Sequence, residues 1–497
     1  MWIMPIWSAY LNSELSDNFG PIPALSAFTG VPGEYNKVED IYTYILKELK
    51  EAVASLDESI DMSAMSKYDP FFGGDIKKWK KYGNSLRMRL AMRLTAVNPS
   101  LAQAEFEDAA KGEFIASMDD IAQVAEKDGW DPYTGVMTRT WNNQAMSTTF
   151  NNLVVGLGGV EFPVPDELKS NLKDPYTYLG QNGSLHFPTT TNDPCAGYFF
   201  DGIPQYIDPR APQLYSIPGY DDGVVYPSYI GAASEVKDEI TLIAGDYTDV
   251  LTGQKVSAPE VKLPMKYSWT TVVAGNWNDK AGLVGDYTSY NYNFPSLADK
   301  FRHSTNKRVW FGPWESYFLL AEAAVYGWNV PGSAKDNYEK GIAASFEYNG
   351  VSDKLLEYLQ SKAYNRVGTS VAFDHTVEAK AYTINYYDAY TKQNKTTTCE
   401  CPKNTIYKND ALTKIITQKF IAQNPWLPLE VWSDHRRLGL PFFENQAVEA
   451  AYNPTNQVLL TPATCKECKV EFYPKRLRYP AVLQTNNLEG YNQALER

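Results

Sequence analysis

Residues that usually carry catalysis or bind metals are scarce in this sequence. Its 497 residues include 4 histidines and 5 cysteines, and the histidines stand far apart, at His186, His303, His375 and His435. The sequence has no glycine loop for phosphate, no GxSxG nucleophile elbow and no HExxH zinc motif. These absences argue against triad catalysis and against a histidine metal centre. Acidic residues are plentiful, so the sequence leaves a catalytic pair of glycosidase carboxylates as an alternative, whose test is the distance between the two carboxyl groups in the structure.

Positive charge and long apolar runs are also in short supply. The 46 lysines and arginines are outnumbered by 59 aspartates and glutamates, which gives a net charge of −13. A phosphate backbone repels such a chain, so we exclude nucleic acid as a ligand. No run reaches the roughly 18 consecutive apolar residues of a membrane-spanning helix. The apolar opening at residues 1–7 lacks a preceding basic region and contains Pro5, so it is not a signal peptide, and any export signal would have been removed.

Aromatic residues, by contrast, are abundant. They make up 14% of the chain, with 35 tyrosines and 12 tryptophans. Tyr and Trp join an apolar face to a hydrogen-bonding edge, which suits contact with polar ligands. The excess therefore favours a protein that meets such ligands, sugars especially, over a broad surface. The alternative is that the rings hold large irregular loops in place.

Four of the cysteines form two close pairs, Cys399 with Cys401 and Cys465 with Cys468, while Cys195 stands alone. Short spacing presents two sulfurs to one ion, so the two pairs could hold a structural metal. They could equally form disulfides, which we favour for an exported protein. In either case we expect them to clamp a loop and to take no part in catalysis, and we expect no other cofactor.

Apolar residues at three- and four-residue steps predict amphipathic helices in two blocks of the chain. The predicted helices span residues 38–56, 76–97, 100–111, 310–326, 333–350 and 352–365. Ser333 caps one of them, Asp336 completes a capping box, and Gly350 suits the left-handed residue that ends it. Paired helices joined by tight turns are typical of tetratricopeptide-type stacking. The predicted fold is therefore mostly α, an α-solenoid scaffold of helix pairs that carries a large loop-rich, partly β region.

The loop-rich region, residues 173–300, is where we expect the ligand site, because loops held on a rigid scaffold often carry function. Its short β-like runs include residues 239–243. Rings stack on the C–H faces of sugars and Asn side chains take hydroxyls, although each ring could instead simply pin a long loop. The candidate ligand-binding residues are Trp269, Asn276, Trp277, Tyr287, Tyr290 and Tyr292, with a second group at Trp130, Tyr133 and Trp141.

Charged residues on the predicted helices have both a functional and a structural interpretation. Asp434 and Arg437 could serve proton transfer, but an ion pair on one helical turn is the simpler interpretation. Arg87 and Arg89 could grip a carboxylate or phosphate ligand, but we expect them to bind acidic neighbours in the fold or to face solvent. For Glu322 we expect an arginine partner.

Several segments resemble the SusD/RagB family. They occur in the family's order along almost the whole chain, at residues 41–56 (IYTYILKELKEAVASL), 74–94 (GDIKKWKKYGNSLRMRLAMRL), 208–210 (DPR), 318–350 (FLLAEAAVYGWNVPGSAKDNYEKGIAASFEYNG), 416–441 (ITQKFIAQNPWLPLEVWSDHRRLGLP) and 474–495 (PKRLRYPAVLQTNNLEGYNQAL). The chain departs from the family in its two cysteine pairs. It also starts after the lipoprotein signal, the acylated cysteine and the early helices that family members carry.

The resemblance implies a single SusD-like domain over residues 1–497. Residues 37–150 and 308–366 would form the helical repeat scaffold, 173–300 the ligand region, 367–410 an insertion, and 411–497 a C-terminal helical and extended segment. It also implies a lipid-anchored protein of the outer membrane and cell surface that acts as a lid on a SusC-like TonB-dependent transporter. Family members bind glycans, and one branch binds peptides.

We therefore expect a nutrient-binding protein, not an enzyme, which captures an oligosaccharide and hands it to the transporter. A peptide-binding receptor of the RagB type is the nearest alternative. A glycoside hydrolase and a scaffold that binds only proteins are the more distant ones.

Overall fold

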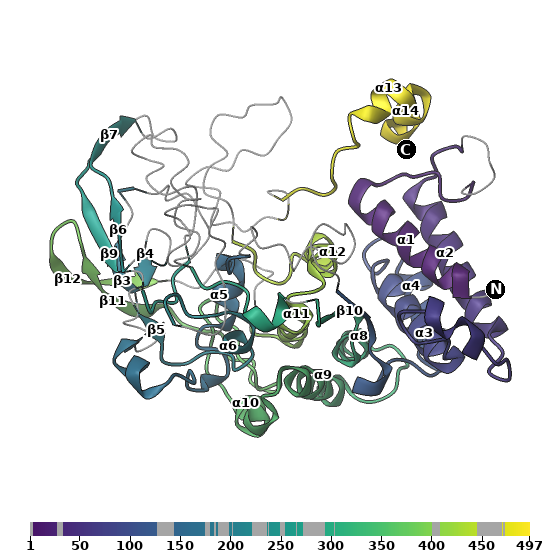
Figure 1. Cartoon of the computed structure of the whole chain (residues 1–497), viewed down its shortest axis with the longest axis horizontal. Coiled ribbons are helices and arrows are strands. Elements are labelled where there is room, and N and C mark those ends of the chain that lie inside the picture. The colour runs from purple at the N-terminus through teal and green to yellow at the C-terminus, as the bar shows by residue number, and fades with distance from the viewer. Residues whose placement is uncertain are drawn as a thin grey trace.

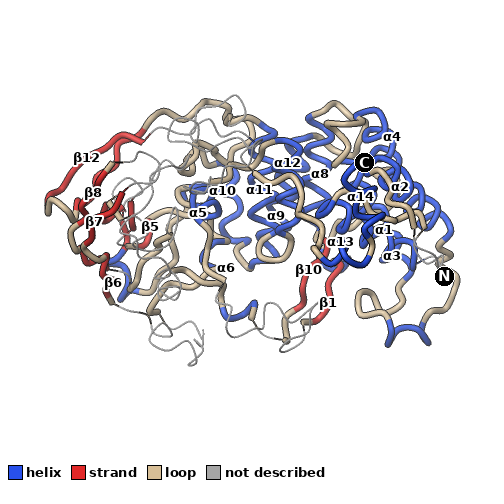
Figure 2. Tube along the Cα trace, turned by 90° about the horizontal axis from the view of Figure 1, so that it is seen from above, coloured by secondary structure: helices blue, strands red, loops and turns tan. Residues whose placement is uncertain are grey.

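The structure is a computed structural model, and it describes residues 3–26, 33–126, 144–173, 179–182, 185–186, 198–200, 202–220, 236, 238–248, 254–264, 266–271, 294–302, 304–399, 408–444, 470 and 473–497. Helices fill one end and the middle of the molecule, and short strands gather at the other end (Figure 1 and Figure 2). Among the residues described, no helix is long and apolar enough to cross a membrane.

The mostly helical fold class predicted from the sequence is confirmed. In chain order the helices are α1 (Ile3–Phe19), α2 (Val38–Ser55), α3 (Ile76–Met92), α4 (Pro99–Ala109), α5 (Thr148–Val154), α6 (Ala211–Leu214), α8 (Pro313–Val325), α9 (Ala334–Asn349), α10 (Leu355–Gln360), α11 (Ala411–Gln423), α12 (Pro428–Leu438), α13 (Val482–Asn486) and α14 (Leu488–Glu496). Short 3₁₀ turns lie at Ser63–Tyr68, Met118–Asp120, Leu157–Gly159, Asp166–Asn171, Asp299–Phe301 and Ser352–Lys354.

The strands are short and form small separate sheets. They are β1 (Ala122–Ala125), β2 (Leu172–Lys173), β3 (Leu179–Asn182), β4 (Tyr198–Phe200), β5 (Ile203–Pro204), β6 (Glu239–Leu242), β7 (Gly245–Thr248), β8 (Lys255–Ala258), β9 (Val261–Pro264), β10 (Lys307–Phe311), β11 (Tyr382–Asp388) and β12 (Gln393–Cys399). β12, β11, β3 and β4 form a four-stranded sheet in that order, while β1 pairs with β10, β2 with β5, β6 with β9 and β7 with β8. The expected β-run at 239–243 is thus confirmed as β6.

Helix pairs form the frame of the molecule. α1 packs on α2, α2 on α3, α3 on α4, and α8 on α9. The predicted inner face of α2 is confirmed, since Ile41, Ile45 and Leu49 are fully buried. α3 also contacts α8, where Arg89 donates to buried Glu315 at 2.6 Å. This ion pair joins the first block of helices to the second.

A second buried polar cluster joins the middle helices around Arg210. Its guanidinium donates to both carboxylate oxygens of Asp208, at 2.9 and 2.7 Å. It also donates to Ser345 on α9 at 3.1 Å and to the side-chain oxygen of Gln418 on α11 at 2.6 Å. Arg210 and Asp208 are both fully buried, so this pair is part of the core.

Helix ends follow the predicted capping signals in part. The Ser333 hydroxyl accepts from the Asp336 N–H at 3.1 Å, and Gly350 ends α9 with φ of 73°, so both expectations for α9 are confirmed. The predicted helix at 76–97 ends early, at Met92. Pro99 is the first residue of α4, and the Asn98 side chain caps this helix by accepting from the Leu101 N–H at 3.2 Å.

Other boundaries were wrong for identifiable reasons. Trp310 is not helical but lies in β10, because residues 307–311 pair with β1, and α8 begins only at Pro313. The helix predicted over 352–365 ends at Gln360. α1 was missed because apolar side chains lie on two faces: Ile6 is buried, whereas Leu11 and Leu15 are exposed, which hides the helical period.

Candidate ligand cleft

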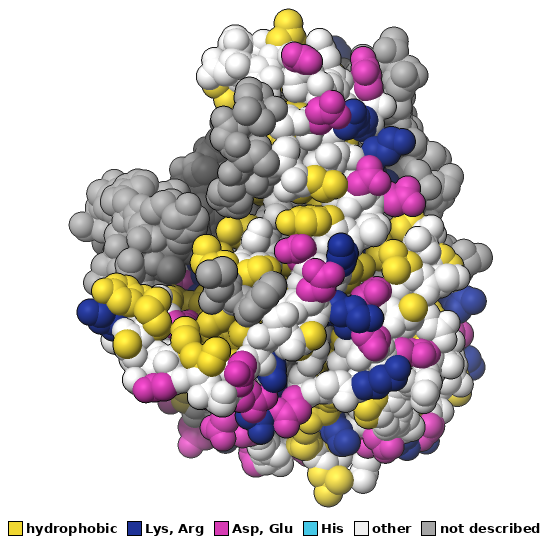
Figure 3. Space-filling view, turned by 90° about the vertical axis from the view of Figure 1, so that its right-hand side faces the viewer, with side chains coloured by type: hydrophobic (Ala, Val, Ile, Leu, Met, Phe, Trp, Pro, Cys, Tyr) yellow, Lys and Arg dark blue, Asp and Glu magenta, His cyan; other side chains and the backbone are white. Residues whose placement is uncertain are grey.

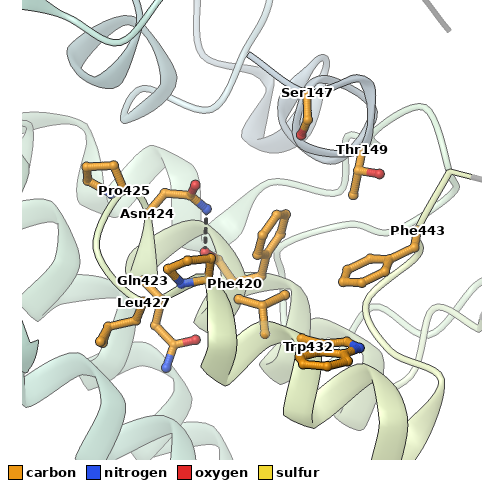
Figure 4. A pocket seen from close by; sticks show the side chains of 11 residues that line it. Ser147, Thr149, Phe420, Gln423, Asn424, Pro425, Leu427, Trp432 and Phe443 are labelled. Carbon is orange, nitrogen blue, oxygen red and sulfur yellow. Dashed lines mark hydrogen bonds between the residues drawn. The ribbon is translucent and has the colours of Figure 1, made fainter. Parts of the chain in front are cut away.

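A cleft of about 280 Å³ opens where the start of α5 faces the turn between α11 and α12 (Figure 4). It combines aromatic and aliphatic side chains with a few polar ones, which is the usual make-up of a small-molecule site. Its lining residues are Ser147, Thr149, Phe420, Gln423, Asn424, Pro425, Leu427, Pro428, Val431, Trp432 and Phe443.

The turn between α11 and α12 shapes one wall of the cleft. α11 ends at Gln423, and the side-chain N–H of Asn424 donates to the Phe420 carbonyl at 2.9 Å (Figure 4). Pro428 then opens α12, where its missing N–H costs nothing. This hydrogen bond fixes the amide nitrogen of Asn424, so the side-chain oxygen of this cleft-lining residue can accept a hydrogen bond from a ligand.

The aromatic rings of the cleft are held from outside it. The Trp432 indole N–H donates to the Pro474 carbonyl at 3.1 Å, and the Arg436 guanidinium lies 4.1 Å from the centre of the same ring. Trp432 lines the cleft, whereas Arg436 does not, so the guanidinium holds the indole from outside the cleft. The Phe443 ring stacks on the His435 ring at 4.1 Å with an angle of 3°.

Polar groups on α5 complete the opposite wall. The Ser147 hydroxyl caps α5 by accepting from Phe150 N–H at 3.1 Å, and the Thr149 hydroxyl accepts from Glu444 N–H at 3.0 Å. Since both oxygens accept from the backbone, each O–H proton can be donated to a ligand. Hydroxyl donors, an amide acceptor and aromatic side chains that line the cleft together suit a neutral molecule rich in hydroxyl or amide groups.

His435, beneath Phe443, carries no charge at neutral pH. Burial, and then the positive charge of Lys475, lower the pKa of His435 to about 3. Neither ring nitrogen has a hydrogen-bond partner among the described residues. The ring therefore serves as a flat support for Phe443.

The acidic side chains of α12 face basic partners in the interior, not the cleft. Asp434 pairs with Arg437 at 3.0 Å and with Lys419 at 2.8 Å, and Arg437 also pairs with Glu322. Burial alone would raise the pKa of Glu430, but the charges of Arg89 and Arg93 outweigh it and lower that pKa to about 2. These carboxylates are ionised and paired, so they have no proton to give.

The structural interpretations of the charged motifs are thereby confirmed. Asp434 and Arg437 form the expected ion pair on α12, and Glu322 has the expected arginine partner. Arg87 pairs with Asp108 at 2.9 Å, as expected for a side chain that ties α3 to α4.

Among the predicted ligand-binding residues, the prediction for Trp269 is wrong. It is 0% exposed, and its ring packs edge-on against Phe162 at 4.9 Å, so it offers a ligand no surface. The others lie outside the described residues and stay predictions: Asn276, Trp277, Tyr287, Tyr290, Tyr292, Trp130, Tyr133 and Trp141.

Of the four cysteines in the two pairs, the structure describes Cys399 alone. Cys399 ends β12, whereas Cys195, Cys401, Cys465 and Cys468 lie outside the described residues. In the part of the chain that is described, no three His, Cys, Asp or Glu side chains gather as metal ligands. Disulfides and a structural metal both stay open for these pairs.

The cleft itself was not predicted, although its signal is present in the sequence. Residues 424–432 (NPWLPLEVW) place two prolines and two tryptophans in the turn after α11 and the first residues of α12. That pattern marks a tight, aromatic-rich turn, but the partner wall on α5 is distant in sequence and has no motif of its own.

Two family models match the chain. One, described as "Starch-binding associating with outer membrane", covers residues 3–158, and the other, "Susd and RagB outer membrane lipoprotein", covers residues 271–497. No curated protein matches.

Solved structures of similar fold cover the chain almost completely. A SusD homologue from Parabacteroides distasonis is 25% identical with a TM-score of 0.67, over 99% of this chain and 78% of its own. A chitin-binding SusD homologue from Flavobacterium johnsoniae is 20% identical with a TM-score of 0.59, over 100% and 77%. One from Bacteroides vulgatus is 19% identical with a TM-score of 0.60, over 100% and 76%.

Proposed function

This chain belongs to the SusD/RagB family of outer-membrane lipoproteins, and from that premise we propose that it captures oligosaccharides at the cell surface and delivers them to a SusC-like TonB-dependent transporter. Carbohydrate binding is the coarse function that the family supports. The observation that carries the finer proposal is the cleft, which the Trp432 and Phe443 rings and the hydroxyl groups of Ser147 and Thr149 line together.

Binding would combine stacking with hydrogen bonds. A pyranose ring laid on Trp432 would present its hydroxyls to Ser147, Thr149 and the Asn424 oxygen. Stacking of a planar ligand face on an aromatic side chain is worth about 1–3 kcal/mol per ring in nucleic acids, and we expect a similar value here. No bond is made or broken, so the sugar leaves unchanged, and we propose a binding protein rather than an enzyme.

Calorimetric titration with matched oligosaccharides tests this proposal. Chito-oligosaccharides come first because one relative of the same fold is described as chitin-binding, and malto-oligosaccharides second because one family model is described as starch-binding. We expect Trp432→Ala to weaken binding about 5- to 150-fold. Tyr68→Ala is the matched control, since Tyr68 is 67% exposed and does not line the cleft. Equal binding by both variants and the native chain would exclude the cleft as the site.

The same titration distinguishes the alternatives. Binding of peptides without binding of any glycan would indicate a RagB-type receptor, which the description of the second family model keeps open. Release of reducing sugar that is abolished by changing one carboxylate pair would indicate a glycoside hydrolase and end the binding-protein proposal.

We propose that the predicted loop aromatics widen the binding surface beyond the cleft. Trp130, Tyr133 and Trp141 precede Ser147 of the cleft in sequence, and Asn276, Trp277, Tyr287, Tyr290 and Tyr292 belong to the other group. Alanine substitution of Trp141 and of Trp277, followed by titration with a long and a short oligosaccharide, tests this. A loss of affinity confined to the long ligand is expected, and no loss for either would refute it.

We propose that Cys399, Cys401, Cys465 and Cys468 clamp a loop through disulfides, with a structural metal as the alternative. Intact mass with and without alkylation under non-reducing conditions decides between free thiols and disulfides. Zinc analysis of the same sample decides whether free thiols hold a metal.

We propose that the helical end of the protein meets the transporter, with a lipid anchor holding the protein at the membrane. Acidic and basic side chains are interspersed over this end, and hydrophobic side chains gather beside them (Figure 3). On α1, Met4, Leu11 and Leu15 are 70%, 44% and 49% exposed. Leu11→Asp with Leu15→Asp should abolish co-purification with the transporter, whereas Leu356→Asp on α10, which is 71% exposed, should not.

A further inference from the structure

A short C-terminal segment, residues 473–479, passes behind the cleft, and we call it the C-terminal strap. Its Pro474 carbonyl accepts from the Trp432 indole at 3.1 Å, and its Lys475 carbonyl accepts from Arg436 at 2.9 Å. Its Tyr473 hydroxyl donates to the Phe443 carbonyl at 2.6 Å. The strap therefore contacts both Trp432 and Phe443 from outside the cleft.

The other end of the strap is fixed to the end of α1. Leu477 N–H donates to the Asn18 carbonyl at 2.7 Å, and the Tyr479 hydroxyl donates to the Pro21 carbonyl at 2.7 Å. Beyond it, α13 and α14 form a small helical unit above α1 (Figure 1). The strap thus joins the cleft to the first helix and to the C-terminal helices.

Arg436 is the residue at which these contacts meet. Its guanidinium lies 4.1 Å from the Trp432 ring centre and donates to the Lys475 carbonyl and, at 2.5 Å, to the Asp17 carbonyl at the end of α1. It also donates to Ser433 on α12 at 3.0 Å. A planar guanidinium can stack on a ring and donate in its own plane at the same time, so one side chain fixes the ring and the strap together.

We propose that Arg436 is a positioning residue for the cleft: from outside it, Arg436 holds the Trp432 ring in place and makes ligand affinity depend on docking of the C-terminal strap against α1. This inference rests on the proposed function, because it concerns the ring on which the sugar is proposed to stack. Residues 474–478 are exposed, so the strap contributes little to the core. Its hydrogen bonds join Trp432, Arg436 and Phe443 to the end of α1.

The first test needs no ligand. Protein labelled with 5-fluorotryptophan gives one fluorine resonance per tryptophan, and Trp432→Phe assigns that of Trp432. We expect Arg436→Met to shift or broaden the Trp432 resonance, Arg436→Lys to do so less, and Tyr479→Phe to broaden it by loosening the strap. Lys340→Met is the matched control, since Lys340 lies over the Tyr317 ring at 5.9 Å and belongs neither to the strap nor to the cleft lining; we expect no change at Trp432.

The second test is titration of the same variants with chitohexaose. We expect Arg436→Met to weaken binding about 3- to 30-fold, the range of a cation–π contact, and Lys340→Met to leave it unchanged. A native Trp432 resonance and native affinity in Arg436→Met, with normal melting, would overturn the proposal. If Arg436→Met does not fold, Arg436→Lys and Tyr479→Phe decide it by the same two measurements. If the native chain does not bind chitohexaose, that result counts against the proposed function. The fluorine spectra still decide whether Arg436 positions Trp432.

Discussion

Replacing Arg210 by Met should destabilise the protein far more than a typical surface change. The variant removes both hydrogen bonds from the guanidinium to Asp208, at 2.9 and 2.7 Å, and leaves that carboxylate in a fully buried position. Gln418 on α11 loses its donor as well. Breaking a buried ion pair by removing one partner costs about 3–5 kcal/mol, and we expect the free energy of unfolding to fall by that amount.

Denaturant unfolding followed by far-UV circular dichroism measures this change. Lys47→Met is the control, because Lys47 pairs with Glu51 at 3.8 Å and both side chains are more than half exposed; such pairs contribute about 0–1 kcal/mol. Adding Asp208→Asn to Arg210→Met should recover part of the loss, since no unpaired charge is then buried. A loss below about 1 kcal/mol in Arg210→Met would refute the argument that this pair holds α9 and α11 together.

Three further outcomes follow from the structure. Burial first, and then the charge of Glu430, raise the pKa of Glu14 from 4.5 to about 7. The contribution of Glu14 to stability is therefore present below about pH 4.5 and is lost as the pH rises to about 7, and this loss is at most about 3 kcal/mol. Glu14→Gln should abolish the loss when the free energy of unfolding is measured between pH 5 and 8. Ser333→Ala should lower the free energy of unfolding by about 1 kcal/mol because α9 loses its cap, and Ser333→Asp, which caps as well, should not. Trp269→Ala should cost about 3–5 kcal/mol because it opens a core cavity; unchanged glycan affinity in the folded variant would agree with its burial, and a selective loss of affinity would contradict it.

The sequence predicted those parts of the fold that depend on local signals. The period of apolar residues located α2, and the Ser333 cap and Gly350 located both ends of α9. The pairing of Trp310 with β1 could not be predicted in the same way, because it depends on a strand almost two hundred residues away along the chain. α1 was hidden because it has no single apolar face.

The ligand site was harder to predict than the frame for a physical reason. A core tryptophan and a tryptophan that borders a cleft have the same side chain, and only the surroundings separate Trp269, which packs on Phe162, from Trp432, which lines the cleft. The cleft also needs α5 and α12 side by side, although nearly three hundred residues separate Thr149 from Trp432. Composition predicts aromatic rings at the ligand site, which stays a prediction, and it could not single out Trp432 and Phe443 as rings that line the cleft.

The ion pairs between the two helix blocks have a consequence for how the protein is made. Arg89 is 226 residues away from its partner Glu315, and Arg93 is 337 residues away from Glu430. During synthesis Arg93 meets Asp17 of α1 early, but Arg89 emerges long before both of its carboxylate partners, Glu315 and Glu430. The first helices therefore stay incompletely packed while most of the chain is produced. Contacts this distant in sequence slow folding, and an early pause or premature stop in translation would leave apolar and cationic helix faces open to aggregation.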